Sequence, residues 1–123
     1  MFITNKKFCV DVLGLDLSTI DTALLAQNME KYGKSFAVYV KHINGIGPNT
    51  EKWFKREYRG DYLTAEDCVK DKLAKDGFDR QLDKFNMRWE HLDFQAIVDH
   101  WCREDGTFCR YQVGDRFYLF EIE

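Results

Sequence analysis

The stretch LDFQAIVDHWCREDGTFCRYQVGDRFYLFEI, from Leu92 to Ile122, contains the clearest start and stop signals in this chain. Asp93 occupies an N-cap position, and Gly106 is placed to end the helix that follows it. Between them, apolar residues recur at helical spacing and form one broad stripe: Phe94, Ile97, Val98, Trp101 and Cys102. The pattern predicts a helix of about three turns with one buried face.

A β-hairpin is predicted directly after this helix. Two strand-like runs, 108–113 and 117–122, flank Gly114-Asp115, a pair suited to a two-residue turn. The second run carries apolar or aromatic side chains on both faces, which suggests an open edge that pairs with another chain. We expect the helix and hairpin to be the nucleus of the core. We also expect the second strand to form a dimer interface through Phe117, Tyr118, Phe120 and Ile122.

Composition places the chain among folded domains. Its 123 residues are 45% hydrophobic and 15% aromatic, enough for a real core. We expect a single domain over 1–123, with 1–60 and 61–123 as its lobes. No apolar run approaches the roughly 18–20 residues of a membrane span, and the first residues do not read as a signal peptide. These features predict a cytoplasmic protein that does not contact a membrane.

The first half of the chain is predicted to hold a strand and helices. Residues 7–15 alternate in the manner of a strand, and Ser18 is placed to cap a helix that ends at Gly33. Residues 35–43 fit a strand or a helix capped by Ser35. Apolar residues expected to face inward on the first helix are Ile20, Ala23, Leu24 and Tyr32.

Three further helical segments are predicted before Leu92. Thr50 caps one whose aromatics, Trp53, Phe54 and Tyr58, are expected in the core. Thr64 opens another, with an inner stripe of Ala65, Cys68, Val69 and Leu73 and outer ion pairs Glu66–Lys70 and Asp71–Lys75. A short helical turn over 78–89 would be held by Leu82, Phe85 and Trp89. The fold class expected is α+β, with several short helices, an N-terminal strand and a C-terminal hairpin packed on a helix.

No motif for catalysis or cofactor binding is present in the sequence. Gly45, Gly47 and Pro48 lack the Lys-Ser/Thr of a phosphate loop, and no His-Glu-x-x-His occurs. The four cysteines lie within apolar patterns without any Cys-x-x-Cys, so we expect reduced core thiols and no metal site. We therefore expect no enzyme activity and no cofactor.

A basic and aromatic run, residues 52–59, leaves nucleic-acid binding open as an alternative. The same pattern also fits an amphipathic helix with core aromatics and solvated Lys and Arg. The formal charge is −3, and the acidic excess lies after Trp89. This negative charge opposes direct binding of nucleic acid by that part of the chain.

Three short segments resemble the ArdA antirestriction proteins of phages, plasmids and conjugative transposons. They are Tyr58 to Asp67 (YRGDYLTAED), Leu92 to Ala96 (LDFQA), and the terminal hairpin with Asp105 to Phe108 (DGTF) and Tyr118 to Glu121 (YLFE). A weaker similarity over Ala26–Ile43 favours the helical alternative for residues 35–43. The chain is shorter and less acidic than is usual in that family.

The resemblance implies a homodimeric protein without enzyme activity that inhibits a host type I restriction–modification enzyme by imitating the charge pattern of DNA. The partner would be a host defence protein. The alternatives are an inhibitor of another defence system, such as an anti-CRISPR protein, and a small nucleic-acid-binding module. A charge mimic needs unpaired carboxylates on one face, and the candidates are Asp61, Asp76, Asp79, Asp83, Asp99, Glu104 and Asp105.

Overall fold

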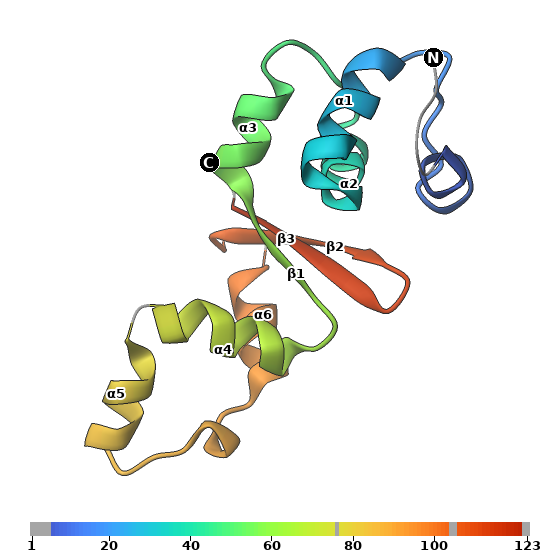
Figure 1. Ribbon diagram of the computed structural model, residues 1–123. Coiled ribbons are helices and arrows are strands. Elements are labelled where there is room, and N and C mark those ends of the chain that lie inside the picture. Colours follow the sequence, from blue (N-terminus) through green and yellow to red (C-terminus); the bar gives the residue numbers. More distant parts are fainter. Residues whose placement is uncertain (1–5, 76, 104–105, 122–123) are drawn as a thin grey trace.

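The computed structural model of the protein describes residues 6–75, 77–103 and 106–121, and for Asp79 the backbone alone. A three-stranded antiparallel sheet lies between two groups of helices (Figure 1). One group, the α1–α3 layer, contains η1 (Phe8–Val12), α1 (Thr22–Tyr32), α2 (Lys34–Ile43) and α3 (Thr50–Glu57). The other, the α4–α6 layer, contains α4 (Ala65–Lys75), α5 (Phe78–Lys84), η2 (Trp89–His91) and α6 (Phe94–Trp101). The predicted α+β class is confirmed.

The sheet is made of β1 (Tyr58–Tyr62), β2 (Phe108–Val113) and β3 (Arg116–Glu121), in the order β1-β3-β2. The predicted hairpin is confirmed, with Tyr111 opposite Tyr118 and Gly114 at φ +61° in the turn. The predicted open edge on β3 is wrong, because β3 is the central strand and pairs on both sides. β1 was not predicted as a strand, and Tyr58, assigned to the preceding helix, is its first residue.

Alternate side chains of β3 enter two different cores. Tyr118 and Phe120 pack with the α1–α3 layer, whereas Phe117 and Leu119 pack with the α4–α6 layer. A strand covered on both faces carries a continuous apolar run, so the run indicates burial and not an exposed edge.

The residues proposed for a dimer interface are therefore core residues. Phe117, Tyr118 and Phe120 are 8%, 6% and 1% exposed, and Ile122 lies outside the described residues. Sheet pairing between two copies would have to use β1 or β2. β1 carries a register irregularity between Tyr58 and Gly60, while β2 pairs with β3 in regular register throughout.

The predicted N-terminal strand is wrong, because residues 8–12 are helical. Cys9 and Leu13, four residues apart, are 0% and 5% exposed and pack into the first core. Val10 and Val12, two apolar residues of the same alternating run, are 39% and 56% exposed. The buried positions thus follow a helical period, which a short alternating run had obscured.

The start and inner face of α1 differ from the prediction, and α2 decides between the two alternatives for residues 35–43. The cap of α1 is Asp21, whose Oδ1 accepts from the Leu24 N–H at 3.1 Å, and not Ser18. Ala23 is exposed and Leu25 is fully buried instead. The ambiguous segment 35–43 is helical, as the family resemblance favoured.

The α4–α6 layer follows the sequence closely. The Thr64 hydroxyl accepts from the Asp67 N–H at 3.1 Å, and Asp93 Oδ1 accepts from the Ala96 N–H at 3.0 Å. Cys68, Val69 and Val98 are fully buried between α4, α6 and the sheet. None of the helices within the described residues has the length and apolar character needed to span a bilayer.

A histidine links the α1–α3 layer to the sheet and should make stability depend on pH. The ring of His42 stacks on Phe120 with centroids 5.0 Å apart and planes at 7°. Burial lowers the pKa of His42, and the Glu57 carboxylate opposes this only in part. The unfolded chain therefore takes up a proton first, near pH 6.5, and folding free energy is lost as pH falls below that value.

We expect urea unfolding to show a stability loss between pH 7.5 and pH 5.5 in the wild type. The His42→Gln variant should lose less over this interval, because its side chain has no proton to gain. Equal losses in both proteins would show that His42 does not carry the effect. The interval lies above the range in which carboxylates titrate.

Candidate partner-binding surface

Two of the carboxylates nominated for charge mimicry are ion-paired. Arg116 Nη1 lies 2.7 Å from Asp61 Oδ2, and Arg110 Nη2 lies 2.7 Å from Asp99 Oδ1. The Gln95 amide also donates to Asp99 at 2.9 Å, and these two hydrogen bonds lower the pKa of Asp99. The requirement that these carboxylates be unpaired is therefore not met at Asp61 and Asp99.

Among the other five nominated carboxylates, only the side chain of Asp83 lies within the described part of the chain. Asp83 is exposed on α5 and forms no ion pair among the described residues. Asp76, Glu104, Asp105 and the side chain of Asp79 lie outside the described part of the chain. Of the three nominated carboxylates whose side chains the structure describes, two are ion-paired and one is exposed on α5.

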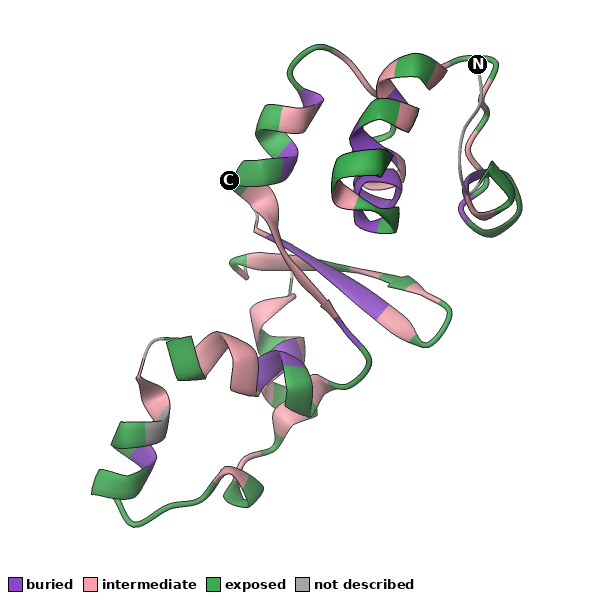
Figure 2. Cartoon of the chain, in the orientation of Figure 1, coloured by how far each residue is buried: buried purple, intermediate pink, exposed green. Residues whose placement is uncertain are grey.

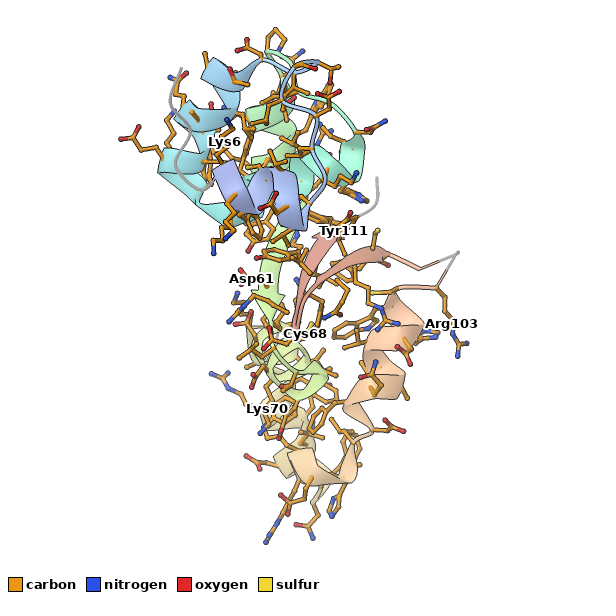
Figure 3. The ribbon with its side chains drawn as sticks, turned by 90° about the vertical axis from the view of Figure 1, so that its right-hand side faces the viewer. Lys6, Asp61, Cys68, Lys70, Arg103 and Tyr111 are labelled. Atoms are coloured by element: carbon orange, nitrogen blue, oxygen red, sulfur yellow. The ribbon has the colours of Figure 1, made fainter. Side chains whose placement is uncertain are left out.

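The outer face of α4 carries mixed charge, as predicted. Lys70 Nζ lies 2.9 Å from Glu66 Oε1, and Lys75 Nζ lies 3.4 Å from Asp71 Oδ2. Figure 3 places Asp61 beside the sheet and Cys68 and Lys70 on the α4 side of it. Because pairs of this kind are self-neutralising, the α4 face does not imitate a row of phosphates.

The most exposed large apolar side chain described is Phe85, at 72%. It follows α5 at the end of the molecule remote from the α1–α3 layer, in a stretch where exposed residues predominate (Figures 1 and 2). Met87, two residues on, is 39% exposed. The sequence predicted Phe85 as an inward anchor, three residues after Leu82, and this is wrong; only Leu82 is buried, at 5%.

Backbone geometry explains why Phe85 turns outward. Asn86 adopts a left-handed conformation at φ +59°, which ends the helical run and reverses the chain. The carbonyl of Leu82 then accepts from the N–H of both Phe85 and Met87, at 3.2 and 2.8 Å. These hydrogen bonds hold the backbone of the turn in one conformation, which lowers the entropic cost of ordering it when a partner binds.

A hollow of about 350 Å³ lies beside this turn. Its apolar wall includes Leu82, Met87 and Trp89, and Trp89 is supported by Phe78 at 6.0 Å between ring centroids. Its polar rim is formed by Lys70, Asp83, Arg88 and Glu90. We call Leu82, Asp83, Phe85, Met87, Arg88 and Trp89 the tip surface; an apolar centre with a charged rim is the usual anatomy of a protein–protein interface.

The tip surface could have been inferred in part from the sequence. Phe85-Asn86-Met87 is flanked by the cations Lys84 and Arg88. Two flanking cations are expected for a turn exposed to solvent and not for a buried turn. The decisive signal is Asn86, a residue that tolerates the left-handed conformation. The helical spacing of Leu82 and Phe85 instead favoured a buried position for both side chains.

The thiols are poorly suited to nucleophilic chemistry. Burial raises the pKa of Cys68 to about 12 and also raises the pKa of Cys9, Cys102 and Cys109. A thiol that stays protonated at neutral pH is a weak nucleophile. Within the residues that the structure describes, no group of His, Cys, Asp and Glu is arranged to hold a metal ion.

Comparison of the chain with protein-family models, with curated proteins and with solved structures gives no significant match.

Proposed function

We propose that this chain is an ArdA-like antirestriction protein, a non-enzymatic inhibitor from a phage or mobile element that binds a host type I restriction–modification enzyme. The observation that carries the proposal is the position of the segments that resemble the family. They are far apart in sequence, yet they form β1 with the start of α4, the start of α6, and the β2–β3 hairpin. These elements pack around one core, in which Tyr62, Val69, Val98 and Leu119 are buried.

The resembling residues have architectural roles in that unit. Thr64 and Asp93 cap α4 and α6, and Gly60 adopts φ +119°, in the left-handed region that favours glycine. These architectural roles support the proposal that the chain has the fold of the family. They support a common target less directly, since one fold serves many functions. The target is therefore the part of the proposal that the experiment must test.

The charge distribution favours contact through the tip surface over imitation of DNA. Asp61, Asp99, Glu66 and Asp71 all have cationic partners, so a DNA-binding groove would have to break these pairs. The tip surface instead offers an exposed aromatic side chain on a hydrogen-bonded turn, beside a hollow with a mixed-charge rim. The same observation supports the second candidate function, inhibition of another defence system such as a CRISPR complex by ordinary protein contacts.

We expect Phe85→Ala to weaken binding to the target enzyme by at least tenfold, equivalent to about 1.4 kcal/mol. The purified protein is titrated into an ATP-dependent cleavage assay of the host type I enzyme, and its affinity is measured separately at low and high salt. Because an apolar contact is little screened, affinity should change only modestly with salt. Val12→Ala, which truncates another exposed apolar side chain in the α1–α3 layer, is the matched control and should inhibit normally.

Several results would count against this proposal. One such result is a steep loss of affinity with salt, together with competition by duplex DNA and no effect of Phe85→Ala. This result would favour inhibition by charge mimicry and show that the tip surface does not contact the enzyme. Absence of inhibition of the type I enzyme at low salt, with inhibition of a CRISPR complex that Phe85→Ala abolishes, would establish the second candidate function.

A further inference from the structure

Helix α3 presents a basic and aromatic face that the proposed function does not use. Trp53 is 40% exposed, although the sequence placed it in the core. Lys52, Lys55 and Arg56 on the same helix are also exposed. An exposed tryptophan among cations is the arrangement that stacks a base and contacts phosphates.

Packing on the opposite side of the helix holds Trp53 in this position. Phe54 is 2% exposed, and its ring lies 4.9–5.6 Å from those of Tyr58, Tyr32, Phe36 and Tyr39. The buried Thr50 hydroxyl accepts from the Gly47 N–H at 2.8 Å and ties the start of the helix to the preceding loop. Phe54 faces the core, and its neighbour Trp53, about 100° away around the helix, lies on a different side and is 40% exposed.

Tyrosine hydroxyls donate hydrogen bonds to both carboxylates of α3. Glu51 Oε2 accepts from the Tyr32 hydroxyl at 2.8 Å and from Lys31 Nζ at 3.2 Å. These bonds lower the pKa of Glu51, the tyrosine first. Glu57 Oε2 accepts from the Tyr39 hydroxyl at 3.0 Å. Both negative charges of the helix therefore have hydrogen-bonded partners, while Lys52 and Lys55 form no ion pair among the described residues and can contact an anion.

A shallow hollow of about 290 Å³ adjoins this face, lined by Pro48, Glu51, Lys52 and Lys55. The combination of a flat exposed indole, paired carboxylates and free lysines fits a flexible anionic chain with planar groups. Duplex DNA hides its bases inside the helix, so a single strand is the form that can use Trp53.

We infer that the α3 face, formed by Lys52, Trp53, Lys55 and Arg56, binds single-stranded nucleic acid. One base stacks on the Trp53 indole, and neighbouring phosphates contact Lys52 and Lys55. Few cations take part, so binding is weak and without strong sequence preference. With roughly two or three phosphates neutralised, the logarithm of affinity should fall against the logarithm of salt with a slope of about −1 to −2.

The test is fluorescence anisotropy with a fluorescein-labelled ten-residue oligothymidylate at low salt. We expect Trp53→Ala to weaken binding at least fivefold and Trp53→Phe to retain most of it, because phenylalanine still offers a ring. Lys52→Ala with Lys55→Ala should weaken binding and flatten the salt dependence. The matched controls, Phe85→Ala and Arg80→Ala with Lys84→Ala, remove an exposed aromatic and two exposed cations from the other layer and should bind as the wild type does.

The inference is overturned if the wild type does not bind the oligonucleotide at low salt, or if Trp53→Ala binds unchanged. Equal affinity for a duplex of the same length would exclude stacking on Trp53. Competition by polyglutamate as effective as that by unlabelled oligothymidylate would make the face a site for an acidic protein instead. Trp53→Ala should leave inhibition of a defence enzyme intact, which separates this surface from the tip surface.

Discussion

Phe120→Ala is expected to destabilise the protein by about 3–5 kcal/mol, the range for removing a buried aromatic ring. Phe120 is 1% exposed in the central strand, and its ring contacts His42, Tyr39 and Tyr58 at centroid distances of 5.0, 5.4 and 5.8 Å. It therefore joins α2, β1 and β3. A cavity at this point could not be closed without moving a helix or a strand, since all three neighbours are themselves packed.

Urea unfolding followed by circular dichroism measures this cost, since a loss of that size is a large part of the roughly 5–15 kcal/mol available to a domain. Phe85→Ala is the matched control, because it deletes the same ring from a position that is 72% exposed. We expect the control to cost less than about 0.5 kcal/mol. A loss below about 1 kcal/mol for Phe120→Ala would mean that β3 does not lie between the two helical layers.

Gly60→Ala is expected to cost about 2–4 kcal/mol, a large effect for the addition of one methyl group. Gly60 adopts φ +119°, and a Cβ there would lie 2.6 Å from the Tyr62 hydroxyl and 3.0 Å from its ring carbon. A non-glycine residue in such a conformation carries strain of about 1–3 kcal/mol. Displacing Tyr62 would also weaken its hydrogen bond to Asp71 Oδ2 at 2.5 Å, and a hydrogen bond to a charged acceptor contributes roughly 1.5–3 kcal/mol.

A double-mutant cycle isolates the contribution of the Tyr62 hydroxyl. In a Tyr62→Phe background the hydroxyl is absent, so Gly60→Ala should cost less than in the wild type, and the residual cost combines backbone strain with the contact of the added Cβ with the ring, whose nearest carbon lies 3.0 Å away. Gly33→Ala is the matched glycine control, since it has φ +75° but open space where its Cβ would lie. If Gly60→Ala costs no more than Gly33→Ala, the close approach of Tyr62 has no energetic consequence.

Local signals account for the parts of the fold that were predicted. Asp93 caps α6, and Gly114-Asp115 turns the hairpin, because these residues form their hydrogen bonds or adopt their dihedral angles within a few positions along the chain. The inner stripe of α4 and its two lysine–carboxylate pairs follow from helical periodicity in the same way. The conformation of residues 8–12 was predicted wrongly, because so short a run fits both a strand period and a helical period.

The candidate surfaces were harder to predict because exposure depends on what covers a residue. Trp53 and Phe85 carry the same apolar signal as Phe54 and Leu82, yet the first pair is exposed and the second is buried. Asn86 marks the turn at Phe85, but apolar spacing alone does not show where the neighbouring layer ends.

The sequence by itself determined the α+β class, five of the helix positions, the caps at Thr64 and Asp93, and the terminal hairpin, because short-range hydrogen bonds and periodicity specify them. Only the tertiary structure decided that β3 is central, that Tyr58–Tyr62 forms a strand, and that Asp61 pairs with Arg116. The physical reason is distance along the chain. β1 pairs with a strand more than fifty residues away and has little strand propensity of its own, so its conformation is set by the partner that its backbone hydrogen-bonds.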